Sequence, residues 1–105
     1  MAGDEQVTVR DDPEQARFEV TLGGEVAGFV AYRQQDGSVA LTHTEVDPAY
    51  EGKGLGSRLL EGTLSELRER GTTVLPYCSF VRSYLQRHPE WVDLVPEQQR
   101  GRFDL

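Results

Sequence analysis

The spacing of the apolar residues changes once along the chain, near Asp47 and Pro48. Before this point apolar and polar residues alternate, as in residues 18–22, and a period of two indicates half-buried strands. After it, Leu55, Leu59, Leu60, Leu64 and Leu67 share one broad face, which is the pattern of an amphipathic helix. The sequence therefore predicts an α/β or α+β fold with a mixed, mainly antiparallel sheet.

Turn residues divide the first half of the chain into strands. Residues 18–22 precede Gly23 and Gly24, residues 26–33 form a second strand, and residues 38–46 a third after the turn at Asp36 and Gly37. A short edge strand is expected at residues 7–10. Consecutive strands joined by tight turns predict an antiparallel meander.

The second half predicts two helices separated by a short strand. A long helix starts after the glycine-rich loop and stops at Gly71, because glycine tolerates the left-handed conformation that ends many helices. Residues 72–75 read as a buried strand, and Ser79 caps a helix that runs to His88. Residues 91–95 are expected to pack back as an extended segment. Residues 96–105 are expected to be loose, so the core covers about residues 7–95.

Length and charge restrict the function further. A chain of 105 residues is expected to form one domain. A net charge of -7 argues against nonspecific binding of nucleic acid, and no apolar run reaches the roughly 20 residues that span a membrane. The first residues lack the pattern of a signal peptide, and the single cysteine, Cys78, cannot form an intramolecular disulfide. We expect a cytoplasmic protein with neutral or cationic partners.

Three glycines alternate in the loop that enters the long helix, at Gly52, Gly54 and Gly56. Glycine lets the backbone approach a ligand closely, and the positive end of a helix favours a phosphate, so a diphosphate fits this loop. A flexible turn that packs strand against helix is the structural alternative. Lys53 is either a mobile point charge for phosphate or a solvated loop residue. The sequence of this loop matches neither the P-loop motif, GxxxxGK[ST], nor the dinucleotide-binding motif, GxGxxG.

The string Glu51-Gly52-Lys53-Gly54-Leu55-Gly56 resembles the acyl-CoA signature of the GNAT superfamily of N-acetyltransferases. That signature is Gln or Arg, two variable residues, Gly, one variable residue, and Gly or Ala, so Glu51 departs from it at the first position. The resemblance covers roughly residues 16–95. It implies that acetyl-CoA is the cosubstrate, that its pyrophosphate binds the loop backbone, and that its pantetheine arm lies along an exposed strand edge. The implied CoA-binding residues are Thr44, Val46, Glu51, Gly52, Lys53, Gly54, Leu55, Gly56 and Ser57.

His43-Thr44 before the loop and Pro76-Tyr77-Cys78 after it are similar to a very small subgroup of this superfamily. Members of that subgroup lack the two helices that usually follow the first strand and cover the acceptor site. The resemblance therefore implies an open acceptor site.

Acetyl transfer to an amine needs a base, and two residues near the end of the third strand are candidates. The resemblance implies that Glu45 accepts the proton directly or through water, although an exposed strand-end glutamate is the simpler reading. His43 lies two residues earlier, so it shares the strand face of Glu45 if no bulge intervenes. His43 is then a base, a substrate-orienting group, or a structural histidine.

Tyr84 and Cys78 are the candidates for the acid and the nucleophile. The resemblance places a tyrosine on the second helix to protonate the departing CoA sulfur, and a core aromatic is the alternative for Tyr84. Cys78 precedes the second helix, whose dipole stabilises a thiolate, so it is a candidate to accept the acetyl group. The alternative is a small buried hydrophobic residue.

The interpretation that follows is acetyl transfer from acetyl-CoA to an amine, without a metal. A small amine or a basic peptide suits the acidic composition. A CoA-binding sensor or adaptor without turnover, and a partner-binding module that uses the Trp91 segment, are the alternative functions. The sequence leaves the oligomeric state open.

Overall fold

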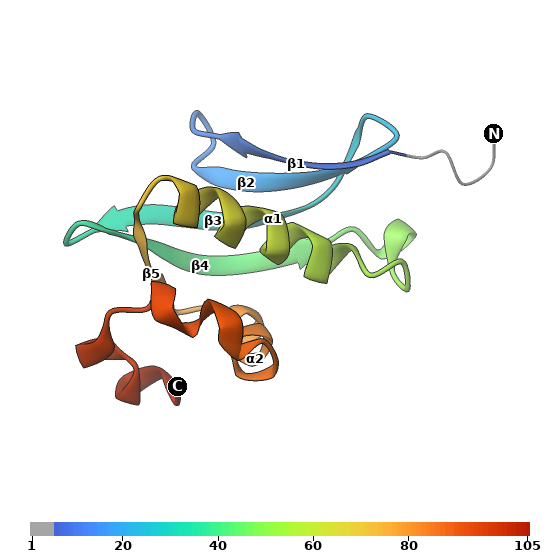
Figure 1. Cartoon of the computed structure of the whole chain (residues 1–105). Coiled ribbons are helices and arrows are strands. Elements are labelled where there is room, and N and C mark those ends of the chain that lie inside the picture. Colours follow the sequence, from blue (N-terminus) through green and yellow to red (C-terminus); the bar gives the residue numbers. More distant parts are fainter. Residues whose placement is uncertain (1–5) are drawn as a thin grey trace.

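The computed structural model describes residues 6–105, and its strands form one five-stranded sheet in the order β1 to β5 (Figure 1). The first four strands form an antiparallel meander, and the fifth pairs parallel with β4. This confirms the predicted mixed, mainly antiparallel sheet. The strands are β1 (Val7–Asp12), β2 (Arg17–Leu22), β3 (Glu25–Gln35), β4 (Ser38–Val46) and β5 (Thr73–Pro76).

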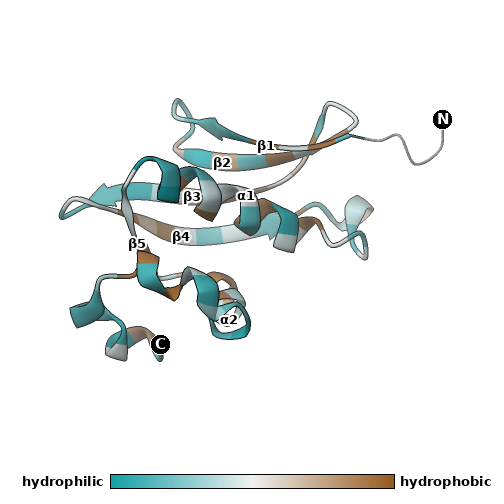
Figure 2. Ribbon diagram, viewed as in Figure 1, coloured by the Kyte–Doolittle hydropathy of each residue, from teal (hydrophilic) through white to brown (hydrophobic). Residues whose placement is uncertain are grey.

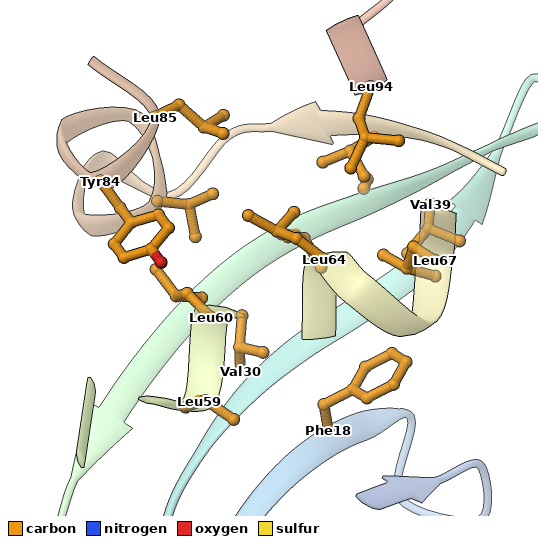
Figure 3. Packing of buried hydrophobic residues seen from close by; sticks show 14 of the residues in the cluster. Phe18, Val30, Val39, Leu59, Leu60, Leu64, Leu67, Tyr84, Leu85 and Leu94 are labelled. Carbon is orange, nitrogen blue, oxygen red and sulfur yellow. The ribbon is translucent and has the colours of Figure 1, made fainter. Parts of the chain in front are cut away.

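The long helix α1 (Leu55–Glu69) lies across one face of this sheet (Figure 1). Hydrophilic and hydrophobic bands follow one another along it in Figure 2, as its leucine spacing requires. Its buried leucines pack with Phe18, Val30 and Val39 from three strands (Figure 3). These leucines are Leu55, Leu59, Leu60, Leu64 and Leu67.

The second helix, α2 (Ser79–Arg87), buries Val81, Tyr84 and Leu85. The prediction that Ser79 caps this helix is wrong, because Ser79 is its first helical residue. Cys78 occupies the N-cap position in an extended conformation, and it makes no capping hydrogen bond through its side chain. The backbone turns one residue earlier because Pro76 ends β5 and leaves only Tyr77 before the cap.

The C-terminal segment differs from its prediction at two points. Residues 91–94 are not extended, because they belong to a 3-10 helix, η2 (Pro89–Leu94); Val95 after it is extended as expected. The fixed φ angle of Pro89 favours the first turn of this helix. Residues 96–105 are not loose. They contain η3 (Glu97–Gln99) and η4 (Gly101–Phe103), and Phe103 is only 3% exposed. Its ring meets Tyr77 edge-on at 5.4 Å, so aromatic packing fixes this end of the chain.

None of the helices in residues 6–105 combines the length and apolar character needed to cross a lipid bilayer.

Candidate functional site

The loop between β4 and α1 presents unused backbone donors. After a short turn, η1 (Pro48–Tyr50), the chain reaches Gly54, which takes the N-cap position with φ +71° and offers no side chain to the helix. In the described part of the chain, no backbone amide from Gly52 to Ser57 donates a hydrogen bond. These amides and the positive helix end can therefore hold an anion.

A pocket of about 270 Å³ opens beside these amides and is called the glycine-loop pocket below. All of the predicted CoA-binding residues line it except Thr44 and Lys53. Tyr50 and Phe80 complete its wall, and sequence reasoning did not assign either of them to the site. A β-carbon on Gly56 would lie 2.8 Å from Phe80 Cζ, so glycine at this position lets the ring close over the helix start.

The strands β4 and β5 separate at the other side of the site. Their pairing ends at Leu41 and Pro76, because proline has no N–H to extend the ladder. The Cys78 amide then donates to the Leu41 carbonyl at 3.0 Å. Beyond this contact, the edge of β4 from Thr42 to Val46 has no strand partner on the β5 side within residues 6–105. The structure thus contains an exposed strand edge of the kind that the resemblance implied.

Cys78 lies where the two strands separate. Its Sγ atom is 3.4 Å from Thr44 Oγ1 on β4. Arg82 fixes the preceding bend, because its guanidinium donates to the carbonyl oxygens of Pro76 and Tyr77 at 3.2 and 2.6 Å. The thiol is partly buried and sits at the N-cap of α2. Its role as a nucleophile stays a prediction.

His43 and Glu45 form a pair on the face of β4 that points away from α1. His43 Nε2 lies 2.8 Å from Glu45 Oε2, and the two side chains are 59% and 62% exposed. The pairing of β3 with β4 skips Thr42, so the bulge precedes His43 and does not separate it from Glu45. Thr44, between them, points to the other side and meets Cys78. The described contacts therefore give two pairs, His43 with Glu45 and Thr44 with Cys78.

Tyr84 lies in the core, apart from both pairs. It is 4% exposed, its ring stacks on His88 at 4.2 Å, and Figure 3 shows it directed toward Leu60. Burial raises the pKa of Tyr84 above its ordinary value, and the charges of Glu61 and Glu90 raise it further. This environment favours the core reading of Tyr84, while its role as the acid stays a prediction.

Residues 17–94 match the family model described as GCN5-related N-acetyl-transferase. The chain therefore belongs to the GCN5-related N-acetyltransferase family, and the resemblance to this superfamily is confirmed.

Curated relatives match over part of their length. The ribosomal protein bS18-alanine N-acetyltransferase of Escherichia coli (strain K12) is 36% identical over 58 residues, which are 55% of this chain and 39% of that protein. The corresponding protein of Shigella flexneri gives the same values. The match thus spans about two fifths of these relatives.

Solved structures agree on the fold. The crystal structure of the ribosomal-protein-S18-alanine N-acetyltransferase from Escherichia coli is 34% identical with a TM-score of 0.50, over 55% of this chain and 38% of that chain. A solution structure of a GCN5-like protein from Staphylococcus aureus covers 90% of both chains with a TM-score of 0.64. At 19% identity, this second likeness concerns the fold alone.

Proposed function

We propose that the chain transfers the acetyl group of acetyl-CoA to an amine. The observation that carries this proposal is the row of free amides from Gly52 to Ser57 beside a pocket at the start of α1. A row of this kind binds the pyrophosphate of a nucleotide-like ligand. Membership of the family supports acetyl-CoA as the donor, because members of this N-acetyltransferase family generally use acetyl-CoA as cosubstrate.

The loop backbone holds the pyrophosphate, and Phe80 and Tyr50 enclose the ligand on the side of α2 and η1. The free edge of β4 at Thr44 and Val46 receives the amide groups of the pantetheine arm. This arm leads from the glycine loop toward Cys78. Bound acetyl-CoA supplies the acetyl group as a thioester, which is open to attack by a thiolate or an amine.

Cys78 accepts the acetyl group first in the route that we propose. Its sulfur forms a bond to the acetyl carbonyl carbon, the bond from that carbon to the CoA sulfur breaks, and the thiol proton passes to CoA. The acceptor amine then attacks the acetyl group on Cys78 and expels the Cys78 thiolate. The pair of Glu45 and His43 takes the proton that the amine loses. Direct attack of the amine on the CoA thioester is the alternative order.

The acceptor is proposed to be a small amine or the amine of a peptide. The names of the Escherichia coli and Shigella relatives give an alanine of a ribosomal protein as their substrate. The proposal extends no further than the amine, because the chain matches only part of those enzymes. A reduced thiol at Cys78 suits the cytoplasm.

A CoA sensor without turnover is the second candidate function. The separation of the His43–Glu45 pair from Cys78 across β4 favours it, because a base that cannot reach the acceptor amine would leave the site able to bind but not to react.

Intact-mass analysis after incubation with acetyl-CoA tests the proposal. We expect one acetyl adduct in the wild type and none in Cys78→Ala, while CoA raises the melting temperature of both. Release of CoA in steady state with an amine panel then separates an enzyme from a sensor. An unchanged melting temperature at millimolar CoA would contradict the family function, and full turnover by Cys78→Ala would assign direct transfer.

A further inference from the structure

The face of the sheet away from α1 carries a second hollow, with a volume of about 350 Å³. Val46 lines this hollow and also the glycine-loop pocket, so the two pockets meet across the last residue of β4. Glu45 lines the hollow from the same strand. A ligand in the hollow would therefore contact the proposed base.

One end of the hollow is cationic. Arg17 lines it, and its guanidinium lies over the Phe29 ring, 4.5 Å from the ring centre. Arg17 also pairs with Glu19 at 2.8 Å, but Arg10 pairs with the same carboxylate at 2.9 Å. Two guanidinium groups thus share the buried carboxylate of Glu19, and Asp12, which faces Arg17 from β1, is a second carboxylate near this end.

The other end of the hollow is anionic. Glu45 has His43 as its ionisable partner. Asp47 accepts a hydrogen bond from the Ala49 amide at 2.9 Å, and no cationic side chain within residues 6–105 pairs with it. Two carboxylates thus face the hollow with one histidine beside them.

The distance between the two ends selects the length of a ligand. Arg17 and Glu45 come from β2 and β4, on either side of β3, and neighbouring strands lie about 4.8 Å apart, so the backbones that carry the two ends are about 10 Å apart. Phe29, which has the Arg17 guanidinium over its ring, and the half-exposed Val26 form the apolar wall of the hollow. An alkyl chain fits this wall.

We propose that this hollow is the acceptor subsite and that it takes a linear alkyl amine with a carboxylate at its far end. The ammonium group binds between Glu45 and Asp47, the chain lies along Phe29, and the carboxylate meets Arg17. The role of the hollow in acetyl transfer rests on the proposed function, whereas the binding of this ligand does not.

Binding to the CoA-free protein tests the ligand class separately from catalysis. The probes are 6-aminohexanoate, hexylamine and 1,6-diaminohexane, which share a six-carbon chain and differ only at the far end. Backbone amide shifts in a nitrogen-15 NMR titration report their affinities. We expect 6-aminohexanoate to bind about tenfold more tightly than either comparator, the effect of one hydrogen bond between charged groups.

Two matched variants locate the preference. Arg17→Gln and Arg10→Gln each remove one guanidinium from Glu19, but Arg10 lines a different hollow. We expect Arg17→Gln to bind the three probes with similar affinity, and Arg10→Gln to keep the preference of the wild type. Urea unfolding of both variants shows how much each change costs the fold.

The proposal is overturned if the diamine binds as tightly as 6-aminohexanoate, or if both variants lose the preference equally. It is also overturned if 6-aminohexanoate does not bind while Cys78 is still acetylated, a result that leaves the proposed function intact. Binding of 6-aminohexanoate by a protein that shows no response to CoA would support the ligand class and reject the proposed function.

Discussion

Thr44 Oγ1 lies 3.4 Å from Cys78 Sγ and so joins two segments that are 34 residues apart in the chain. The contact crosses the gap that opens where β4 and β5 stop pairing. With the hydrogen bond from the Cys78 amide to Leu41, it fixes the thiol at the point where the strands diverge.

Removing the Thr44 hydroxyl should lower the reactivity of Cys78. Thr44→Val keeps the shape of the side chain but cannot donate to the sulfur, and one hydrogen bond is worth about 0.5–1.5 kcal/mol. We expect alkylation of Cys78 by iodoacetamide at pH 7 to slow by about twofold to tenfold. Thr44→Ser keeps the hydroxyl and serves as the control. Equal rates for wild type and Thr44→Val would show that the contact does not act on the thiol.

Gly54→Val should abolish CoA binding and should also lower the free energy of unfolding. Gly54 has φ +71°, and a side chain in this left-handed region costs roughly 1–2 kcal/mol. Gly71→Val is the matched control, because Gly71 has φ +69° and lies at the far end of α1. We expect both variants to lose similar stability in urea, and only Gly71→Val to retain a rise in melting temperature with CoA. A normal CoA response of Gly54→Val would exclude this loop as the phosphate site.

Gly56→Ala should show energetic coupling with Phe80. Alanine stabilises a helix by about 0.5–1 kcal/mol relative to glycine, but at position 56 its β-carbon would lie 2.8 Å from Phe80 Cζ. We therefore expect Gly56→Ala to stabilise the protein in a Phe80→Ala background and to gain less, or to lose stability, in the wild type. A double-mutant cycle in urea measures the difference, and a coupling energy near zero would mean that the ring does not press on this position.

Tyr32 should make the protein less stable at high pH. Burial, followed by a hydrogen bond from its hydroxyl to Asp11 at 2.7 Å, raises the pKa of Tyr32 from 10.0 to about 12. Between these values the unfolded chain releases the phenol proton and the folded chain keeps it. Stability from this group is thus complete below pH 10 and is lost as the pH rises toward 12.

Urea midpoints at pH 9 and pH 11 check this expectation. Tyr32→Phe has no proton to release, so its midpoint should fall less between the two values than that of the wild type. The same decrease in both proteins would assign the pH dependence to other groups.

The alternating strands and the leucine helix were predictable because each depends on a repeated local pattern. The strand at residues 38–46 agrees with the structure for this reason. The long helix begins at Leu55, inside the glycine-rich sequence instead of after it. The glycine loop was also predictable, since its conformation depends on residues close together in sequence. The match of residues 17–94 to the family model then confirmed the family.

Other features depend on contacts between distant residues, which no local pattern encodes. The exposed ring of Phe80 belongs to the glycine-loop pocket only because α2 packs beside the start of α1. Phe103 is buried because its ring packs edge-on against Tyr77, which lies 26 residues earlier in the chain. The second hollow likewise combines residues from β2, β3 and β4.

The divergence of β4 and β5 also bears on aggregation. An unpaired strand edge is a template for pairing with another chain, and proteins protect such edges by making them short or by interrupting them with bulges. The free edge of β4 runs only from Thr42 to Val46, and the bulge lies at its first residue. Cys78 and the glycine loop flank its two ends. The short edge and its bulge thus limit strand addition by a neighbouring chain, while the edge stays open to a slender ligand.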